Sequence, residues 1–240
     1  MGIADVTRAM RKVLPLPYCG AVIVAAGTAS RMGGIDKVMA PLGGEPMVVR
    51  TVRAFQNCDG IREIVVVTRP DLIVPIRSLC HSFPKLKIVV AGGKTRQESV
   101  SIGLSALSRR VKLAAIHDGA RPLVSYEVID RTVRAANTYS AAAPAIPVKD
   151  TVKVVQGAVV TATPHRENLR AVQTPQVFDI DLLRGALKKA KDDGAEVTDD
   201  CSAVERIGAV VKIVEGDERN LKVTTPMDLK IAELLLEEMK

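Results

Sequence analysis

Six short apolar runs recur along the chain, and most of them are continuous rather than alternating with polar residues. Several are rich in valine and isoleucine, which is typical of parallel strands buried on both faces. Segments with helical periodicity lie between the runs. This order predicts an α/β fold with a doubly wound, mostly parallel sheet and right-handed crossovers. The predicted strands are residues 21–26, 63–68, 87–91, 113–117, 142–148 and 210–215.

Start signals place five helices between and after these strands. Pro46 is expected at the first position of one helix, where its missing N–H costs nothing. Thr95 and Glu98 form a capping-box pattern ahead of another. Ser125 and Thr225 are the expected N-caps of two more. The predicted helices are residues 48–55, 99–107, 126–136, 182–191 and 227–239.

Residues 150–175 break the alternation of strands and helices. Two β-prone stretches flank Gln156-Gly157, which predicts a hairpin around a glycine turn. A lone hairpin is marginally stable in water, so we expect it to act as a β-arm that packs on a partner subunit. Folding back onto its own domain is the alternative. We therefore divide the chain into one domain, residues 18–240, and an N-terminal extension, residues 1–17, whose purpose the sequence does not indicate.

A turn of small residues follows the first predicted strand. Ala25, Ala26 and Gly27 would let backbone N–H groups approach an anion closely, and Arg31 and Lys37 supply positive charge shortly afterwards. The segment therefore predicts a loop that binds a polyphosphate. An ordinary strand–helix connection is the alternative reading. The spacing matches neither a Walker A loop nor a dinucleotide-binding fingerprint.

Polar and basic residues also follow the later strands, where ligands bind in doubly wound sheets. Arg96 follows the third strand, Asp118 and Arg121 the fourth, Thr151 the fifth and Lys222 the last. Taken singly, Arg96 could be a solvated helix residue, Asp118 could cap a turn and Arg121 could pair with it. His117 at a strand end is more often a structural residue than a catalyst. The recurrence of such groups at one edge of the sheet is what indicates a binding site.

Composition narrows the ligand. The chain of 240 residues has a net charge of +7, but only 2% of its residues are aromatic and none is tryptophan. Base-stacking surfaces would be scarce, so we expect small anionic ligands and no nucleic-acid polymer. The four cysteines lack metal-site spacing with the three histidines and read as free thiols of a reducing compartment. With no apolar run of membrane-spanning length and no signal-peptide pattern, we expect no membrane contact and a cytoplasmic location.

The order of these motifs resembles that of the 2-C-methyl-D-erythritol 4-phosphate cytidylyltransferase family, over the chain from about residue 21 onward. The first motif is shared by many sugar-nucleotide transferases, whereas the full series is far more specific. The segments that carry the resemblance are AAG at 25–27 with Arg31, Met32 and Lys37; GG at 92–93 with Arg96, Ser99 and Val100; HDGARP at 117–122; PVKDT at 147–151; QTPQ at 173–176; TDD at 198–200; and NLKVT at 220–224.

The resemblance implies transfer of CMP from CTP to the phosphate of 2-C-methyl-D-erythritol 4-phosphate, with Mg²⁺ and release of pyrophosphate. It implies a homodimer, with Arg166 following a dimer arm that reaches into the partner's site. It leaves the metal ligands unassigned, with Asp118 near the ribose, the metal or the acceptor. By resemblance the catalytic cations are Arg31, Lys37, Arg166 and Lys222; the nucleotide contacts are Ala25, Ala26, Gly27, Gly92, Arg96, Ser99, Asp118 and Gly119; and the acceptor contacts are Asp118, Arg121, Thr151, Arg166, Thr174 and Lys222.

Other readings stay open at this point. Ala29 stands where many relatives have a second glycine, which leaves the nucleotide pose undetermined. A cytidylyltransferase acting on ribitol 5-phosphate would share the CTP loop and differ around Thr151, Arg166 and Thr174. A nucleotide-sugar pyrophosphorylase usually carries a longer C-terminal domain than this chain. A non-catalytic nucleotide-binding relative would be expected to lose at least one of the four predicted catalytic cations, and all four are present.

Overall fold

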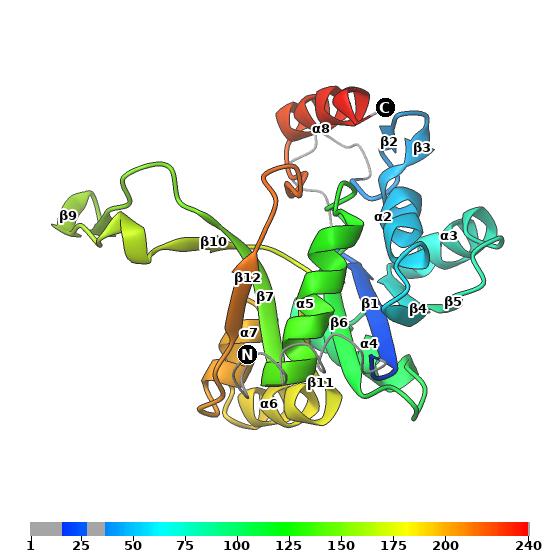
Figure 1. Cartoon of the computed structure of the whole chain (residues 1–240), viewed down its shortest axis with the longest axis horizontal. Coiled ribbons are helices and arrows are strands. Elements are labelled where there is room, and N and C mark those ends of the chain that lie inside the picture. Colours follow the sequence, from blue (N-terminus) through cyan, green and yellow to red (C-terminus); the bar gives the residue numbers. More distant parts are fainter. Residues whose placement is uncertain (1–15, 28–36, 240) are drawn as a thin grey trace, which may run out of the picture.

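The fold is an α/β sandwich built on one mixed sheet, seen in Figure 1, in a computed structural model that describes residues 16–27 and 37–239. The sheet has eight strands. Seven are hydrogen-bonded to their neighbours in the order β10-β7-β11-β6-β1-β4-β5, and the eighth, β12, also pairs with β7. These strands are β1 (Cys19–Ala25), β4 (Ile61–Thr68), β5 (Leu86–Ala91), β6 (Leu113–Asp118), β7 (Ala141–Pro147), β10 (Arg170–Val172), β11 (Gln176–Asp179) and β12 (Lys212–Glu215).

The predicted doubly wound, mostly parallel sheet is confirmed. Strand β1 pairs in parallel with β4 and β6, β4 with β5, and β7 with β12. All six predicted strands are present, with ends that differ by a few residues. Strands β10 and β11 were not predicted, and β11 lies antiparallel between β6 and β7. Strand β10 is also antiparallel to β7, so the chain reverses direction between the end of β7 and the start of β10.

Helices cover both faces of the sheet. They are α2 (Met47–Gln56), α3 (Ile73–Leu79), α4 (Arg96–Ala106), α5 (Tyr126–Tyr139), α6 (Ile180–Asp192), α7 (Asp200–Glu205) and α8 (Pro226–Glu238), with short 3-10 turns η1 (Pro70–Leu72) and η2 (Arg166–Asn168). Alternate residues of β1 enter different cores: Ala21 and Ile23 pack with α2, α3 and α5, whereas Val22 packs with α4, α6 and α7. Burial on both faces explains why these strands read as continuous apolar runs.

The five predicted helices are present, with two corrections at their starts. Pro46 is not the first helical residue; it is the N-cap of α2 and belongs to the two-stranded hairpin of β2 (Pro41–Leu42) and β3 (Glu45–Pro46). The Thr95 hydroxyl accepts the N–H of Glu98 at 3.1 Å as predicted. The Glu98 carboxylate, however, accepts the N–H of Lys94 at 2.7 Å instead of completing the capping box. Helices α3 and α7 were not predicted.

Of the predicted β-arm, residues 150–175, the part before β10 leaves the body of the molecule as Figure 1 shows, whereas β10 pairs with β7 and Thr174 is buried. Its tip is the hairpin of β8 (Val154–Gln156) and β9 (Val159–Ala162), which pair antiparallel. Gly157 adopts a positive φ of 59°, as the predicted glycine turn requires. Every residue of both strands is exposed. The expected hairpin is confirmed, and within the described chain it has no core of its own.

Within residues 16–27 and 37–239, no helix combines the length and apolar character needed to cross a membrane.

Candidate active site

A pocket of about 500 Å³ opens at the carboxyl ends of four neighbouring parallel strands. Ala25 at the end of β1, Arg69 after β4, Gly93 after β5 and Asp118 at the end of β6 all line it. This is where ligands bind in doubly wound sheets. The full lining is Val24, Ala25, Ala26, Gly27, Lys37, Val38, Arg69, Gly93, Lys94, Thr95, Arg96, Ser99, Asp118, Ala120 and Lys222.

Eight of the sequence-predicted site residues therefore come together in one pocket. They are Ala25, Ala26, Gly27, Lys37, Arg96, Ser99, Asp118 and Lys222. Arg31 and Ala29 lie outside the described residues, so their predicted roles stay predictions. The sequence reasoning missed Arg69 as a site residue. Its position as the first residue after β4 is the signal that could have identified it.

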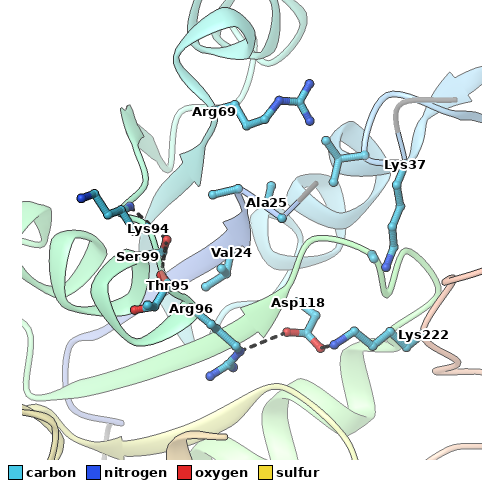
Figure 2. A pocket seen from close by; sticks show the side chains of 15 residues that line it. Val24, Ala25, Lys37, Arg69, Lys94, Thr95, Arg96, Ser99, Asp118 and Lys222 are labelled. Carbon is cyan, nitrogen blue, oxygen red and sulfur yellow. Dashed lines mark hydrogen bonds and ion pairs between the residues drawn. The ribbon is translucent and has the colours of Figure 1, made fainter. Parts of the chain in front are cut away.

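Asp118 is the electrostatic centre of the pocket. Figure 2 shows its carboxylate between Arg96 and Lys222. The Lys222 ammonium lies 2.8 Å from one carboxylate oxygen, and the Arg96 and Arg121 guanidinium groups approach the carboxylate at 3.8 Å. Burial alone would raise the pKa of Asp118, but Lys222, then Arg96 and Arg121, lower it to about 2. The carboxylate is therefore ionised at neutral pH.

Arg96 is held by a second carboxylate from a distant part of the chain. One Nη of Arg96 lies 2.7 Å from Asp200, whose side chain is 1% exposed. Burial opposes the charge of Arg96, but the Asp200 carboxylate outweighs it and raises the pKa of the guanidinium. Gln176 in turn accepts the backbone N–H groups of Asp200 and Cys201, each at 3.1 Å. The two motifs at 173–176 and 198–200 therefore meet behind Arg96 and fix its orientation.

The loop between β5 and α4 is tied to the floor of the pocket by glycine and serine. The Gly93 N–H donates to the Ser99 hydroxyl at 3.1 Å, and that hydroxyl donates to the Thr95 carbonyl at 3.0 Å. A Cβ on Gly92 would lie 2.6 Å from the Cβ of Ala26 and 2.8 Å from the Ser99 hydroxyl. Gly92 thus allows the loop after β5 to touch the loop after β1, although Gly92 does not itself line the pocket.

Three predicted contacts lie behind the pocket wall instead of in it. A Cβ on Gly119 would lie 3.0 Å from the Cβ of Ala25, so this glycine also permits close packing. The Thr174 hydroxyl accepts the backbone N–H of Asp118 at 3.1 Å. Arg121 donates to the Asn220 carbonyl at 2.6 Å. These residues position Asp118 and its surroundings, and direct contact with a substrate stays a prediction for them.

The loop that carries Lys222 is anchored by a buried asparagine. Asn220 is fully buried and donates to the carbonyl of Thr174 at 2.9 Å and to the side-chain oxygen of Gln173 at 3.3 Å. The Val223 N–H donates to the Ala120 carbonyl at 2.9 Å on the other side of Lys222. Lys222 is therefore brought to Asp118 by anchors on both sides.

Thr151 and Arg166 lie elsewhere. Both are exposed residues of the β-arm, and neither lines the pocket. The Arg166 guanidinium donates to the Lys149 carbonyl at 2.9 Å, within the base of the arm. Their predicted contact with an acceptor is therefore not made within this pocket of the same described chain.

The pocket suits a highly charged anion. Five cationic side chains line it: Lys37, Arg69, Lys94, Arg96 and Lys222. Among the described residues, Asp118 is the one carboxylate in that lining. Lysine offers a compact charge and arginine a planar pair of donors, so the group can bind several phosphate oxygens at once.

The same residues do not fit a metal ion held by protein side chains alone. Within the described ranges there is no group of three histidine, cysteine, aspartate or glutamate side chains that could hold one. The Asp118 carboxylate is ion-paired with Lys222 at 2.8 Å. We therefore assign no metal ligand in this part of the chain.

Comparison with known proteins agrees with this geometry. A family model described as 2-C-methyl-D-erythritol 4-phosphate cytidylyltransferase matches residues 19–238. The enzyme of that name from Symbiobacterium thermophilum is 47% identical over 219 residues, covering 90% of this chain and 92% of its own. Its namesake from Geobacillus kaustophilus is 45% identical over 219 residues, covering 90% and 96%.

Solved structures give the same result. The crystal structure of 4-diphosphocytidyl-2C-methyl-D-erythritol synthase from Anaerococcus prevotii superposes with a TM-score of 0.84 at 32% identity, covering 92% of this chain and 96% of that one. The cytidylyltransferase from Thermus thermophilus superposes with a TM-score of 0.76 at 34% identity, covering 90% and 98%. The chain therefore belongs to the 2-C-methyl-D-erythritol 4-phosphate cytidylyltransferase family.

Proposed function

We propose that this protein transfers CMP from CTP to 2-C-methyl-D-erythritol 4-phosphate, giving 4-diphosphocytidyl-2-C-methyl-D-erythritol and pyrophosphate. The observation that carries the proposal is the gathering of five cationic side chains in one pocket at the carboxyl edge of the sheet, two of which, Arg96 and Lys222, are paired with the ionised Asp118 carboxylate. Family membership over residues 19–238 narrows this anion site to one reaction.

The chemistry needs charge and alignment more than a dedicated base. The acceptor phosphate is already a nucleophile at neutral pH, and its oxygen attacks the α-phosphorus of CTP as pyrophosphate leaves. Lys37, with Arg31 outside the described residues, is assigned to the triphosphate. Lys222 is assigned to the acceptor phosphate. Neutralising two anions and holding them in line is the main task of such a site.

The nucleoside end is assigned to the other side of the pocket. Here the β5–α4 segment contributes Gly93, Thr95 and Ser99 to the lining, and so adds backbone and hydroxyl groups beside the charges of Lys94 and Arg96. Such groups suit the edge of a cytosine ring and its ribose. Mg²⁺ is proposed to accompany the triphosphate, because Mg²⁺ is commonly held by substrate phosphates with few protein ligands.

The β-arm is proposed to form a homodimer and to carry Arg166 and Thr151 toward the acceptor site of the other subunit. The support is its exposed apolar tip, where Val154, Val155, Val159 and Val160 are 48–68% exposed. An exposed strip of valines at the end of a long projection is typical of a surface that is buried against another protein chain. A cytoplasmic location is proposed from the four cysteines, all of which are buried free thiols.

The direct test is pyrophosphate release from CTP and Mg²⁺ with each of two acceptors. We expect release with 2-C-methyl-D-erythritol 4-phosphate and none with ribitol 5-phosphate. Release only with ribitol 5-phosphate would keep the chemistry and overturn the substrate. Folded protein that binds CTP but releases no pyrophosphate with either acceptor would contradict the proposal.

A further inference from the structure

His117 is a buried histidine beside the pocket that the chemistry above does not use. It is the residue before Asp118 in β6, and its exposed fraction is 0%. Its ring packs against Phe55 of α2, with ring centroids 4.8 Å apart and planes tilted by 54°. Both ring nitrogens nonetheless have polar partners, so the side chain is more than a filler of the core.

The partners of the two nitrogens determine where its proton lies. Nε2 is 3.2 Å from the carbonyl oxygen of Arg121. A carbonyl only accepts, so Nε2 must carry the hydrogen. In the neutral ring Nδ1 is then an acceptor, and the Thr174 hydroxyl 3.0 Å away donates to it. With its hydrogen so directed, the Thr174 oxygen turns a lone pair to the backbone N–H of Asp118, 3.1 Å away.

One imidazole ring thus holds both ends of the turn that carries the site's carboxylate. The Asp118 end is reached through Thr174, and the Arg121 end is reached directly. The turn itself is closed by the Arg121 N–H, which donates to the Asp118 carbonyl at 3.0 Å. The other neutral tautomer would lose the bond to the Arg121 carbonyl, and a protonated ring would reverse the bond to Thr174.

We propose that His117 is a positioning residue for the cytidylyl transfer: as the neutral Nε2–H imidazole it orients the Thr174 hydroxyl and the 118–121 turn, and so holds the Asp118 carboxylate among Lys222, Arg96 and Arg121. The inference rests on the proposed function, because it assigns an effect on that reaction. His117 touches none of the reacting groups. It acts through Thr174 and the backbone.

The surroundings keep the ring neutral. Burial lowers the pKa of His117 to about 4, and the nearby Asp118 carboxylate only partly opposes this. The charged groups that face the ring are Asp118 and Arg121. Its neighbours from the other packed elements, Phe55 and Thr174, are uncharged. At neutral pH the imidazole is therefore available as one donor and one acceptor.

The kinetic test compares His117→Phe, which keeps the ring shape, with His117→Asn, which places an amide oxygen near the position of Nδ1. With wild-type activity established, we expect kcat to fall about ten- to a hundredfold in His117→Phe, by more than KM for either substrate changes, and to recover in part in His117→Asn. A filler role would lower the melting temperature and leave kcat unchanged. That result in folded His117→Phe would overturn the inference, whereas inactive wild type would instead contradict the proposed function.

A double-mutant cycle tests whether the effect passes through Thr174. If His117 acts by orienting that hydroxyl, adding Thr174→Val to His117→Phe should lower kcat little further, because the first change has already broken the chain. Losses that multiply independently would overturn the pathway.

Nitrogen NMR of the wild-type ring needs no variant and does not depend on turnover. We expect a bare Nδ1 and a protonated Nε2 at pH 7. Finding the opposite tautomer or an imidazolium would overturn the assignment.

Discussion

At the scale of single residues, the site is organised by the Asp118 carboxylate, which is shared by Lys222, Arg96 and Arg121. Three positive groups placed this close would repel one another without it. Their mutual anchor fixes the cations before any substrate arrives, so little rearrangement is needed when phosphates enter. Such preset charge is the feature that most lowers barriers in phosphoryl transfer.

Replacing Lys222 by alanine should cripple turnover. The change removes the cation 2.8 Å from Asp118 and leaves the acceptor phosphate without its proposed partner. We expect the variant to lose about 3 kcal/mol of transition-state stabilisation, which lowers kcat/KM roughly a hundredfold or more. Steady-state pyrophosphate release measures this. Lys189→Ala is the matched control, since Lys189 pairs with Asp193 on the exposed face of α6; equal losses in the two variants would contradict the role.

His117 predicts how stability depends on pH. Its pKa falls from 6.5 in the unfolded chain to about 4 in the fold. Between these values the unfolded chain binds the proton and the folded protein does not, so stability falls as pH falls from 6.5 to 4. The loss should reach about 3 kcal/mol from this residue alone. Urea titrations at several pH values give the free energy of unfolding at each pH. This free energy should depend less steeply on pH in His117→Phe than in wild type, and an identical pH dependence would refute the assignment.

The sequence could predict which of these residues line the pocket, but not which partners hold their side chains in place. Arg96, Asp118 and Lys222 each follow a recognisable strand, and parallel strands end at a common edge. The partner of Arg96 is Asp200, 104 residues away. The carboxyl ends of strands do not indicate that pairing, because it depends on where α7 packs. Thr174 is a similar case, since its hydroxyl accepts the backbone N–H of Asp118 from behind the pocket wall.

At the scale of elements, the β5–α4 loop depends on close contact with the first loop. Gly92→Ala would place a Cβ 2.6 Å from Ala26 and 2.8 Å from Ser99, pushing the two nucleotide loops apart. We expect KM for CTP to rise at least about tenfold, because a misplacement of this size weakens aligned binding. Gly185→Ala in α6 is the control, with nothing within 4 Å of its Cβ, and should stabilise the protein by about 0.5–1 kcal/mol. An unchanged KM in Gly92→Ala would contradict the contact.

The arm should lose its partner when its apolar tip is made charged. Val159 is 68% exposed in β9, and burying a carboxylate there against another subunit would be costly. Val159→Asp is expected to convert a dimer to a monomer in sedimentation velocity and to lose turnover with it. Val210→Asp, at a valine 82% exposed near β12, should stay dimeric. A monomeric wild type would remove the basis of the proposal.

The sequence pattern correctly predicted a strand where the segment is long and buried on both faces. The strands from Ile61 to Thr68 and from Leu113 to Asp118 are of this kind. Strands β10 and β11 have three and four residues, too short for any periodicity to show. They become strands because β6 and β7 offer them open edges, which is a property of the assembled sheet.

At the scale of the whole molecule, the net charge of +7 and the five cations of the pocket act together on anionic substrates. Raising KCl from about 0.1 M to 1 M shortens the screening length from roughly 10 Å to 3 Å. We expect KM for CTP to rise at least about threefold over this range while kcat changes less. Sucrose at matched osmolality is the control, and a salt-independent KM would show that charge does not govern capture.

The last helix of the chain packs on the segment that follows its first loop. Ala40, Leu42 and Met47 share a core with Val223 and Ala232, and Leu236 lies against the turn at Gly43. A nascent chain emerging from the ribosome therefore has β1, β4, β5 and β6 long before it has this contact, whereas the last strand of the sheet, β12, precedes α8 closely. Lys222 also arrives late. We expect a chain that ends within α8 to keep the strands of its sheet and to lose the packing that supports Ala40, Leu42 and Met47, the segment that follows Lys37 of the pocket.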